Sequence, residues 1–254
     1  MRHYGLIGWP LGHSFSKQYF REKFEREGIL DACYDLFPLE NIAELPDLLA
    51  HYPDLCGLNV TIPYKESVIP WLDALDETAR VVGAVNCIRI TKDRKLTGYN
   101  TDVTGFEKSL LNSGFMRDPM VENALILGTG GASKAVAYVL KKLGITYKFV
   151  SRKPVAENEI SYDSLIHPPF GFQPPTLLVN TTPLGTFPRL EEMPPLPLDI
   201  FYPGLFVYDL IYNPAETLLL REARFRGCKL KNGLEMLELQ AEAAWEIWQK
   251  TYDP

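Results

Sequence analysis

"ENALILGTGGASKAVAYVLKKLG", residues 122–144, joins an apolar strand, a glycine-rich turn and an amphipathic helix in direct succession. Gly128, Gly130 and Gly131 occupy the turn, and Ser133 stands where the strict G-x-G-x-x-G motif has its third glycine. Glycine lets the backbone approach a pyrophosphate closely, and a helix N-terminus offers N–H groups and a positive dipole to that charge. The stretch therefore predicts the first β-α unit of a dinucleotide-binding domain, with a plain tight turn as the alternative.

The rest of the chain repeats this alternation of strands and helices. Strand patterns cover residues 4–8, 32–37, 54–62, 146–153, 176–185 and 205–214, and helix patterns cover 16–28, 101–114 and 233–250. Strands that alternate with helices predict parallel crossovers and a doubly wound sheet, whose ligands bind at the carboxyl ends of the strands. We expect an α/β protein of two domains.

Composition excludes several classes of function. The 254 residues carry a net charge of −6 with a pI near 5.3, which gives no general attraction to nucleic acid or to an anionic membrane. No apolar run reaches the roughly 20 residues that span a bilayer. The four cysteines lack C-x-x-C spacing, the N-terminus lacks a signal peptide, and the histidines lack zinc-site spacing. These features predict a cytoplasmic protein without a metal site.

A basic segment follows the second strand of the predicted nucleotide domain. Ser151, Arg152 and Lys153 stand roughly 20 residues after the glycines, where NAD-binding proteins place an acid on the ribose 2′-hydroxyl. Arg152 could hold a 2′-phosphate through charge-assisted hydrogen bonds. The segment favours NADP over NAD, and a solvated basic strand end is the alternative.

Two charged residues in the first half need an explanation. In "GLNVTIPYKE", residues 57–66, Leu58, Val60 and Ile62 alternate as in a buried strand, and Lys65 follows Pro63. "GYNTD" ends at Asp102. Lys65 could sit in water and Asp102 could cap the next helix, so these residues alone leave both interpretations open.

Eight motifs, in this order along the chain, resemble those of shikimate dehydrogenases: "GHSFS", "NVTIPYKE", "GAVN", "GYNTD", "LGTGGAS", "NTTPLG", "YDLIYNP" and "GLEMLELQA". The resemblance implies NADPH-dependent reduction of 3-dehydroshikimate to shikimate, in aromatic amino-acid biosynthesis on the chorismate pathway. It also implies a substrate-binding catalytic domain over residues 1–103, a Rossmann-like NADP domain over 104–235, and a C-terminal helix over 236–254 that packs back on the substrate domain.

The resemblance assigns roles to particular residues. Lys65 and Asp102 would be the catalytic pair. The substrate would be bound by Ser14, Ser16, Asn59, Thr61, Asn86, Tyr212 and Gln240. The cofactor NADP would be bound by Gly128, Gly130, Gly131, Ala132, Ser151, Arg152, Lys153, Thr181, Leu210 and Gly233.

The chain departs from the family pattern at three places, one of which is a shortened helix between Lys153 and Thr176. Phe15 and Lys17 interrupt the usual Ser-Leu-Ser-Pro, and Ser151-Arg152-Lys153 replaces the usual Asn-Arg-Thr, which bears on cofactor affinity. Two alternatives remain: a quinate or aminoshikimate dehydrogenase of the same architecture, and a non-catalytic NADP or metabolite sensor. We expect a monomer or a homodimer whose partners are small molecules.

Overall fold

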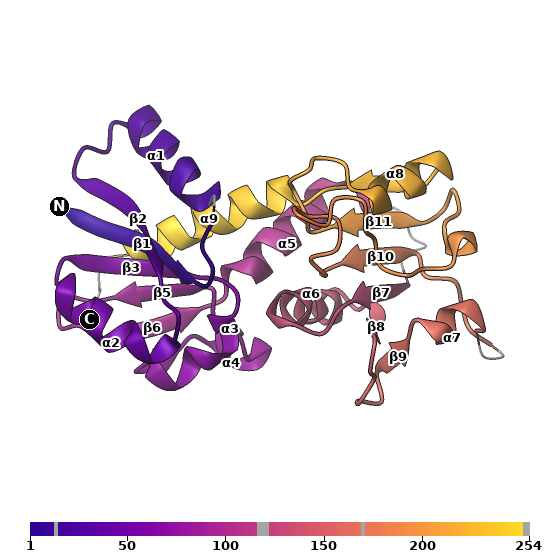
Figure 1. Cartoon of the computed structure of the whole chain (residues 1–254), viewed down its shortest axis with the longest axis horizontal. Coiled ribbons are helices and arrows are strands. Elements are labelled where there is room, and N and C mark those ends of the chain that lie inside the picture. Colours follow the sequence, from indigo (N-terminus) through magenta and orange to yellow (C-terminus); the bar gives the residue numbers. More distant parts are fainter. Residues whose placement is uncertain (13–14, 116–121, 169–170, 251–254) are drawn as a thin grey trace. The chain divides into compact units, whose positions relative to one another are not determined.

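The computed structural model describes residues 1–12, 15–115, 122–168 and 171–250 (Figure 1). The chain forms two compact units. Unit 1 is Met1–Thr104 together with the chain from Gln240 onward, and unit 2 is Gly105–Leu239. Each unit contains one six-stranded sheet with helices against it.

Unit 1 contains a mixed sheet with the strand order β2-β1-β3-β5-β6-β4. β1 pairs in parallel with β2 and β3, whereas β5 is antiparallel to β3 and β6. The strands are β1 (Arg2–Gly8), β2 (Ala32–Pro38), β3 (Leu55–Val60), β4 (Ala74–Leu75), β5 (Cys87–Ile90) and β6 (Leu96–Tyr99). The helices are α1 (Phe15–Glu27), η1 (Ile42–Glu44), α2 (Leu45–His51), α3 (Tyr64–Ser67), η2 (Ile69–Trp71) and α4 (Glu77–Val82).

Side chains of unit 1 divide between two faces of this sheet, as the two-residue period of a strand requires. Tyr4 and Leu6 of β1 pack in a cluster with Phe20 and Phe24 of α1. Ile7 of the same strand belongs to a second cluster with Leu45 of α2. Because both faces are covered by apolar side chains, most of β1 is buried.

The C-terminal helix α9 (Leu234–Gln249) contributes its last three turns to unit 1. The indole of Trp248 stacks on Tyr4 with ring centroids 4.8 Å apart and donates a hydrogen bond to the carbonyl of Ile88 at 3.0 Å. A Cβ at Gly57 would lie 2.2 Å from the indole nitrogen, so β3 accepts this ring only because residue 57 lacks a side chain. Trp245 joins the same cluster.

Unit 2 contains an all-parallel sheet with the strand order β12-β11-β10-β7-β8-β9. The strands are β7 (Asn123–Leu127), β8 (Thr146–Ser151), β9 (Glu159–Ser161), β10 (Leu177–Asn180), β11 (Phe206–Asp209) and β12 (Lys229–Lys231). The helices are α5 (Thr101–Asn112), which begins in unit 1, α6 (Gly131–Lys142), α7 (Asp163–Ile166), η4 (Leu198–Ile200) and α8 (Leu218–Phe225). The chain runs outward from β7 to β9 and returns to β10 on the other side of β7, which makes this point the topological switch of a doubly wound sheet.

The α/β prediction is confirmed, and several strand boundaries are wrong. In unit 2, β8, β10 and β11 end at Ser151, Asn180 and Asp209, before the predicted residues 153, 185 and 214. β3 ends at Val60, and Ile62 is 70 % exposed instead of buried. After Val60 the chain leaves the sheet in a turn, in which the N–H of Tyr64 bonds to the carbonyl of Thr61, and α3 begins there. Among the described residues, no helix is both long and apolar enough to cross a bilayer.

A buried carboxylate ties two strands of unit 2 together. Asp209, at the end of β11, is fully buried and accepts hydrogen bonds from the Asn180 side chain, the Ile211 N–H and the Thr217 hydroxyl. Burial outweighs these bonds and raises the pKa of Asp209 from 3.8 to about 6. The motifs "NTTPLG" and "YDLIYNP" are therefore joined by the hydrogen bond between Asn180 and Asp209.

The pKa of Asp209 predicts a pH dependence of stability. Because the folded state binds this proton more tightly than the unfolded chain, the stabilisation is present below pH 4 and is lost as pH rises through about 6. The full shift corresponds to roughly 3 kcal/mol. The free energy of unfolding is measured in urea by circular dichroism. Asp209→Asn should lack the pH-dependent part of this free energy between pH 4 and 7. Asp199→Asn, a control at an exposed site, should retain it. Parallel pH curves for wild type and Asp209→Asn would contradict the assignment.

Candidate active site

Lys65 and Asp102 form an ion pair within unit 1. Lys65 lies on α3 and Asp102 in the first turn of α5, and the ammonium nitrogen is 2.6 Å from Asp102 Oδ2. Their side chains are 19 % and 9 % exposed, so the pair is largely buried yet still reaches the surface. Lys65 is therefore not a solvated lysine beyond a strand. The carbonyl of Lys65 also accepts the N–H of Val85 at 2.7 Å, which ties α3 to the segment before β5.

The carboxylate of Asp102 is not used to cap its helix. Asn100 Oδ1 accepts the Val103 N–H at 3.3 Å, and Asn86 Oδ1 accepts the Thr101 N–H at 2.6 Å. These helix N–H groups are therefore already bonded. Asp102 Oδ2 accepts a hydrogen bond from Lys65, and Asp102 Oδ1 accepts one from Asn86 Nδ2 at 2.8 Å. Two donors from different elements thus fix the orientation of the carboxylate.

The carboxamide of Asn86 is the centre of this arrangement. Asn86 follows α4, is 3 % exposed, and its Nδ2 lies 3.0 Å from Thr101 Oγ1 and 3.4 Å from Gln240 Oε1. Gln240 belongs to α9, and its Oε1 is also 3.4 Å from the Thr101 hydroxyl. The amide group therefore connects the start of α5 to α9, about 140 residues further along the chain.

A second set of hydrogen bonds connects Asn86 to α1. The Asn59 amide donates to the carbonyl of Asn86 at 3.3 Å, and Asn59 Oδ1 accepts the hydroxyl of Tyr34 at 2.8 Å. Ser16 on α1 hydrogen-bonds to the same tyrosine, and burial raises the pKa of Tyr34 well above its ordinary value. Tyr34 and Thr101 were not among the predicted site residues. Thr101 lies within "GYNTD", but Tyr34 had no signal beyond its place in an apolar strand.

The remaining predicted substrate residues are Thr61, Tyr212 and Ser14. Thr61 is half-buried, and its N–H bonds to the carbonyl of Ile7. Tyr212 belongs to unit 2, where it follows β11 and burial raises its pKa. Ser14 lies outside the described residues. The structure therefore brings Ser16, Asn59, Asn86 and Gln240 into one hydrogen-bonded network with the Lys65–Asp102 pair.

The glycine turn of unit 2 has the geometry that its sequence predicts. Gly128 has φ +106°, a conformation that favours glycine, and a Cβ there would lie 2.8 Å from Thr181 Oγ1. Gly130 is the N-cap of α6 and faces open space. Ser133, in place of the third glycine, is buried and donates to the carbonyl of Gly130 at 2.5 Å. The serine therefore closes the turn internally, and the side facing the N-terminus of α6 stays open.

The remaining cofactor candidates lie at the same edge of the sheet. The Gly128 N–H bonds to the carbonyl of Val150, directly before Ser151, and the hydroxyl of Thr181 donates to the carbonyl of Leu127. Leu210 follows β11 and touches Gly233, where a Cβ would lie 2.0 Å from the Leu210 carbonyl oxygen. The exposed Arg152 and Lys153 line a pocket of about 340 Å³ with Ser151. An open helix N-terminus and a basic rim at the carboxyl edge fit a dinucleotide with an additional phosphate.

Comparison with known proteins identifies the family. The model of the shikimate dehydrogenase substrate binding domain matches residues 6–88. A curated relative, the shikimate dehydrogenase (NADP(+)) of Moorella thermoacetica, is 40 % identical over 96 % of this chain and 86 % of its own length. The chain belongs to the shikimate dehydrogenase family.

Solved structures of shikimate dehydrogenases share the whole architecture. Shikimate dehydrogenase 1 from Peptoclostridium difficile superposes with a TM-score of 0.84 at 35 % identity, covering 100 % of this chain and 94 % of that one. Shikimate 5-dehydrogenase from Thermus thermophilus, solved in complex with NADP(H) and shikimate, has a TM-score of 0.84 at 31 % identity and covers 98 % and 94 %. The substrate-domain model of this family ends two residues after Asn86 and contains Lys65.

Proposed function

We propose that this protein is an NADP-dependent shikimate dehydrogenase, an oxidoreductase that interconverts 3-dehydroshikimate and shikimate in aromatic amino-acid biosynthesis. The observation that carries the proposal is the Lys65–Asp102 ion pair at 2.6 Å, embedded in a network of amides and hydroxyls. The family and the proteins that bind NADP(H) and shikimate in it support the same reaction.

Lys65 suits the charge that develops during reduction of a ketone. As hydride reaches the carbonyl carbon, negative charge grows on the oxygen, and a cation close to that oxygen stabilises the transition state and can supply the proton. Asp102 holds the ammonium in one position, and Asn86 holds Asp102. In the reverse direction the same pair removes the proton from the hydroxyl.

A ring that carries several hydroxyls and a carboxylate explains the polar side chains around the pair. Hydroxyl and amide groups on Ser16, Asn59, Asn86 and Gln240 can donate and accept hydrogen bonds, as ring hydroxyls require. We include Ser14, Thr61 and Tyr212 in the substrate site on the resemblance alone. Sites of this kind reject analogues that leave their polar groups unpaired.

We assign NADP to the carboxyl edge of the sheet in unit 2. The turn of Gly128, Gly130, Gly131 and Ala132 would hold the pyrophosphate, and Ser151, Arg152 and Lys153 would hold the 2′-phosphate. Thr181, Leu210 and Gly233 would line the remainder of the site. When bound, NADPH supplies the hydride for the reduction.

The location and assembly of the protein follow from the same features. The four cysteines are free thiols, which fits the reducing cytoplasm. We propose that the protein is cytoplasmic and is a monomer or a homodimer.

One assay tests the reaction directly. The purified protein is mixed with shikimate or quinate and with NADP or NAD, and reduction of the nicotinamide is followed by absorbance. We expect shikimate with NADP to react fastest. A faster reaction with quinate would favour a quinate dehydrogenase, and ligand binding without turnover would favour a sensor.

Loss of the Lys65 ammonium should slow turnover. Lys65→Met keeps most of the apolar stem but removes the proton donor, and general acid catalysis typically contributes about 10²- to 10⁴-fold. We expect kcat to fall by that range with a modest change in KM for shikimate. Lys95→Met, the same change at a lysine that is 68 % exposed, is the control. Turnover within a few-fold of wild type would rule out the proposed role of Lys65.

Arg152 should decide the preference for NADP. Charge-assisted hydrogen bonds are worth about 1.5–3 kcal/mol each, so Arg152→Ala should raise KM for NADP by roughly tenfold to a few hundredfold. KM for NAD, which lacks the phosphate, should barely change. Arg221→Ala on α8 removes an exposed arginine of the same unit and serves as the control. An equal loss for both cofactors would remove the phosphate assignment from Arg152.

A further inference from the structure

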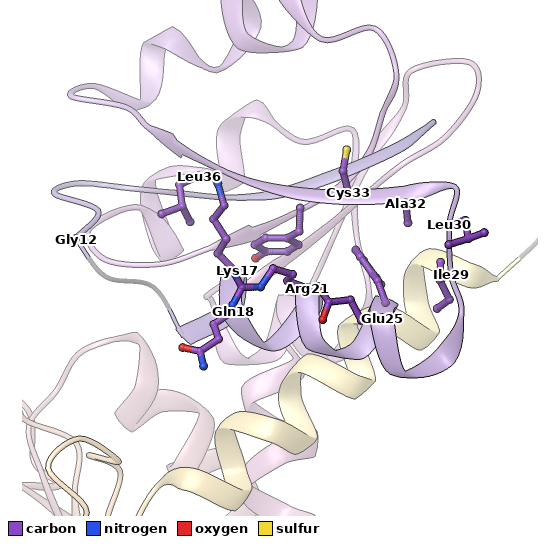
Figure 2. Close-up of a pocket in the computed structure, with 12 residues that line it drawn as sticks. Gly12, Lys17, Gln18, Arg21, Glu25, Ile29, Leu30, Ala32, Cys33 and Leu36 are labelled. Carbon is purple, nitrogen blue, oxygen red and sulfur yellow. The ribbon is translucent and has the colours of Figure 1, made fainter.

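Three metal-ligating side chains gather on one face of the sheet in unit 1, away from the candidate active site. The ligand atoms of His3 on β1 and of Cys33 and Asp35 on β2 all lie within 4.8 Å of one another. The parallel register opposes His3 to Cys33, and Asp35 is two residues further along the same strand. Figure 2 shows the Cys33 sulfur on the side of β2 opposite to Ala32 and Leu36, which point towards α1.

We propose that His3, Cys33 and Asp35 form a binding site for a borderline-soft divalent metal ion of the Zn²⁺ class. An imidazole, a thiolate and a carboxylate are the three ligand types that zinc sites use. Around a tetrahedral ion with ligand bonds of about 2.0–2.3 Å, ligand atoms lie roughly 3.3–3.6 Å apart. His3 Nε2 and Asp35 Oδ2 are already 3.1 Å apart, so small rotations of side chains would complete the set.

The histidine is held in the orientation that a metal ligand needs. Its side chain is 10 % exposed, and its ring contacts those of Phe37 and Tyr52, with centroid distances of 5.5 and 5.3 Å. While Nε2 faces Asp35, Nδ1 lies 3.6 Å from a carboxylate oxygen of Asp54. A carboxylate on the second ring nitrogen is the usual outer partner of a metal-bound histidine, because it fixes the tautomer and raises the basicity of the ligand.

The side chains around the cluster carry more negative than positive charge when His3 is neutral. The ammonium of Lys17 lies 2.9 Å from Asp35 Oδ1, the oxygen that does not face His3, and offsets one of the two carboxylates, Asp35 and Asp54. A thiolate and the remaining carboxylate would then neutralise the ion.

A metal ion binds cysteine as the thiolate, so binding of the ion at Cys33 would release the thiol proton. Three protein ligands leave one position open to water. Because β2 is at one end of the strand order, the ion would join this terminal strand to β1.

The expectation of no metal site rested on spacing along the sequence. His3 and Cys33 are thirty residues apart, and only the pairing of β1 with β2 brings them together. The present proposal is independent of the proposed enzymatic reaction, because none of its residues belongs to the substrate or cofactor set.

Cobalt binding tests the site with a spectroscopic readout. The full-length protein, reduced and freed of metal, is titrated with Co²⁺, and the thiolate-to-cobalt charge-transfer absorption is recorded. We expect one equivalent to produce the band, Zn²⁺ to displace it, and the melting temperature to rise with either ion. Cys33→Ser should abolish the band, whereas Cys228→Ser, a half-buried thiol of unit 2, should retain it.

Two further variants separate ligation from folding. Asp35→Asn should weaken Co²⁺ binding without loss of the circular dichroism spectrum, and Asp54→Asn should raise the dissociation constant by about 10- to 100-fold, as loss of an outer partner does. Shikimate oxidation by the metal-free variants should equal that of wild type. The proposal is overturned if wild type gives no charge-transfer band, or if Cys33→Ser keeps it.

Discussion

The carboxamide of Asn86 joins elements that the chain order keeps far apart. Its oxygen accepts the first N–H of α5, and its nitrogen donates to Asp102 and lies near Gln240 of α9. Because this amide is buried, a missing partner would leave a polar group unpaired at a cost of about 1–3 kcal/mol. The network therefore has one favourable arrangement. In that arrangement Asp102 is turned towards Lys65 and away from the N-terminal N–H groups of its own helix.

Unit 2 also contains buried polar side chains that bond to one another and to the backbone. Asn180 and Asp209 are buried where β10 and β11 end, and each satisfies the other and the turn that follows it. At the carboxyl edge, these turns hold Thr181 beside Gly128 and Leu210 beside Gly233. Buried polar residues at these strand ends thus support the backbone that would receive the cofactor.

The proposed metal site results from the pairing of β1 with β2. A parallel sheet places residues of equal register side by side, so His3 meets Cys33 and the neighbouring Asp35. The Lys65–Asp102 pair arises differently, from two helix termini that are held together by hydrogen bonds around Asn86. In both cases the chemistry depends on side chains that are thirty or more residues apart.

The sequence by itself determined the alternation of strands and helices, the glycine turn before α6 and the family, because period, glycine placement and motif order are local properties that one chain displays directly. It did not place the end of β3 or the exposure of Ile62, since the point at which a strand leaves its sheet depends on its neighbours. It also left open whether Asp102 caps a helix or faces a lysine. Only the tertiary structure decided this, because Asn100 and Asn86 bond to the N–H groups at the start of α5 and leave the Asp102 carboxylate to Lys65.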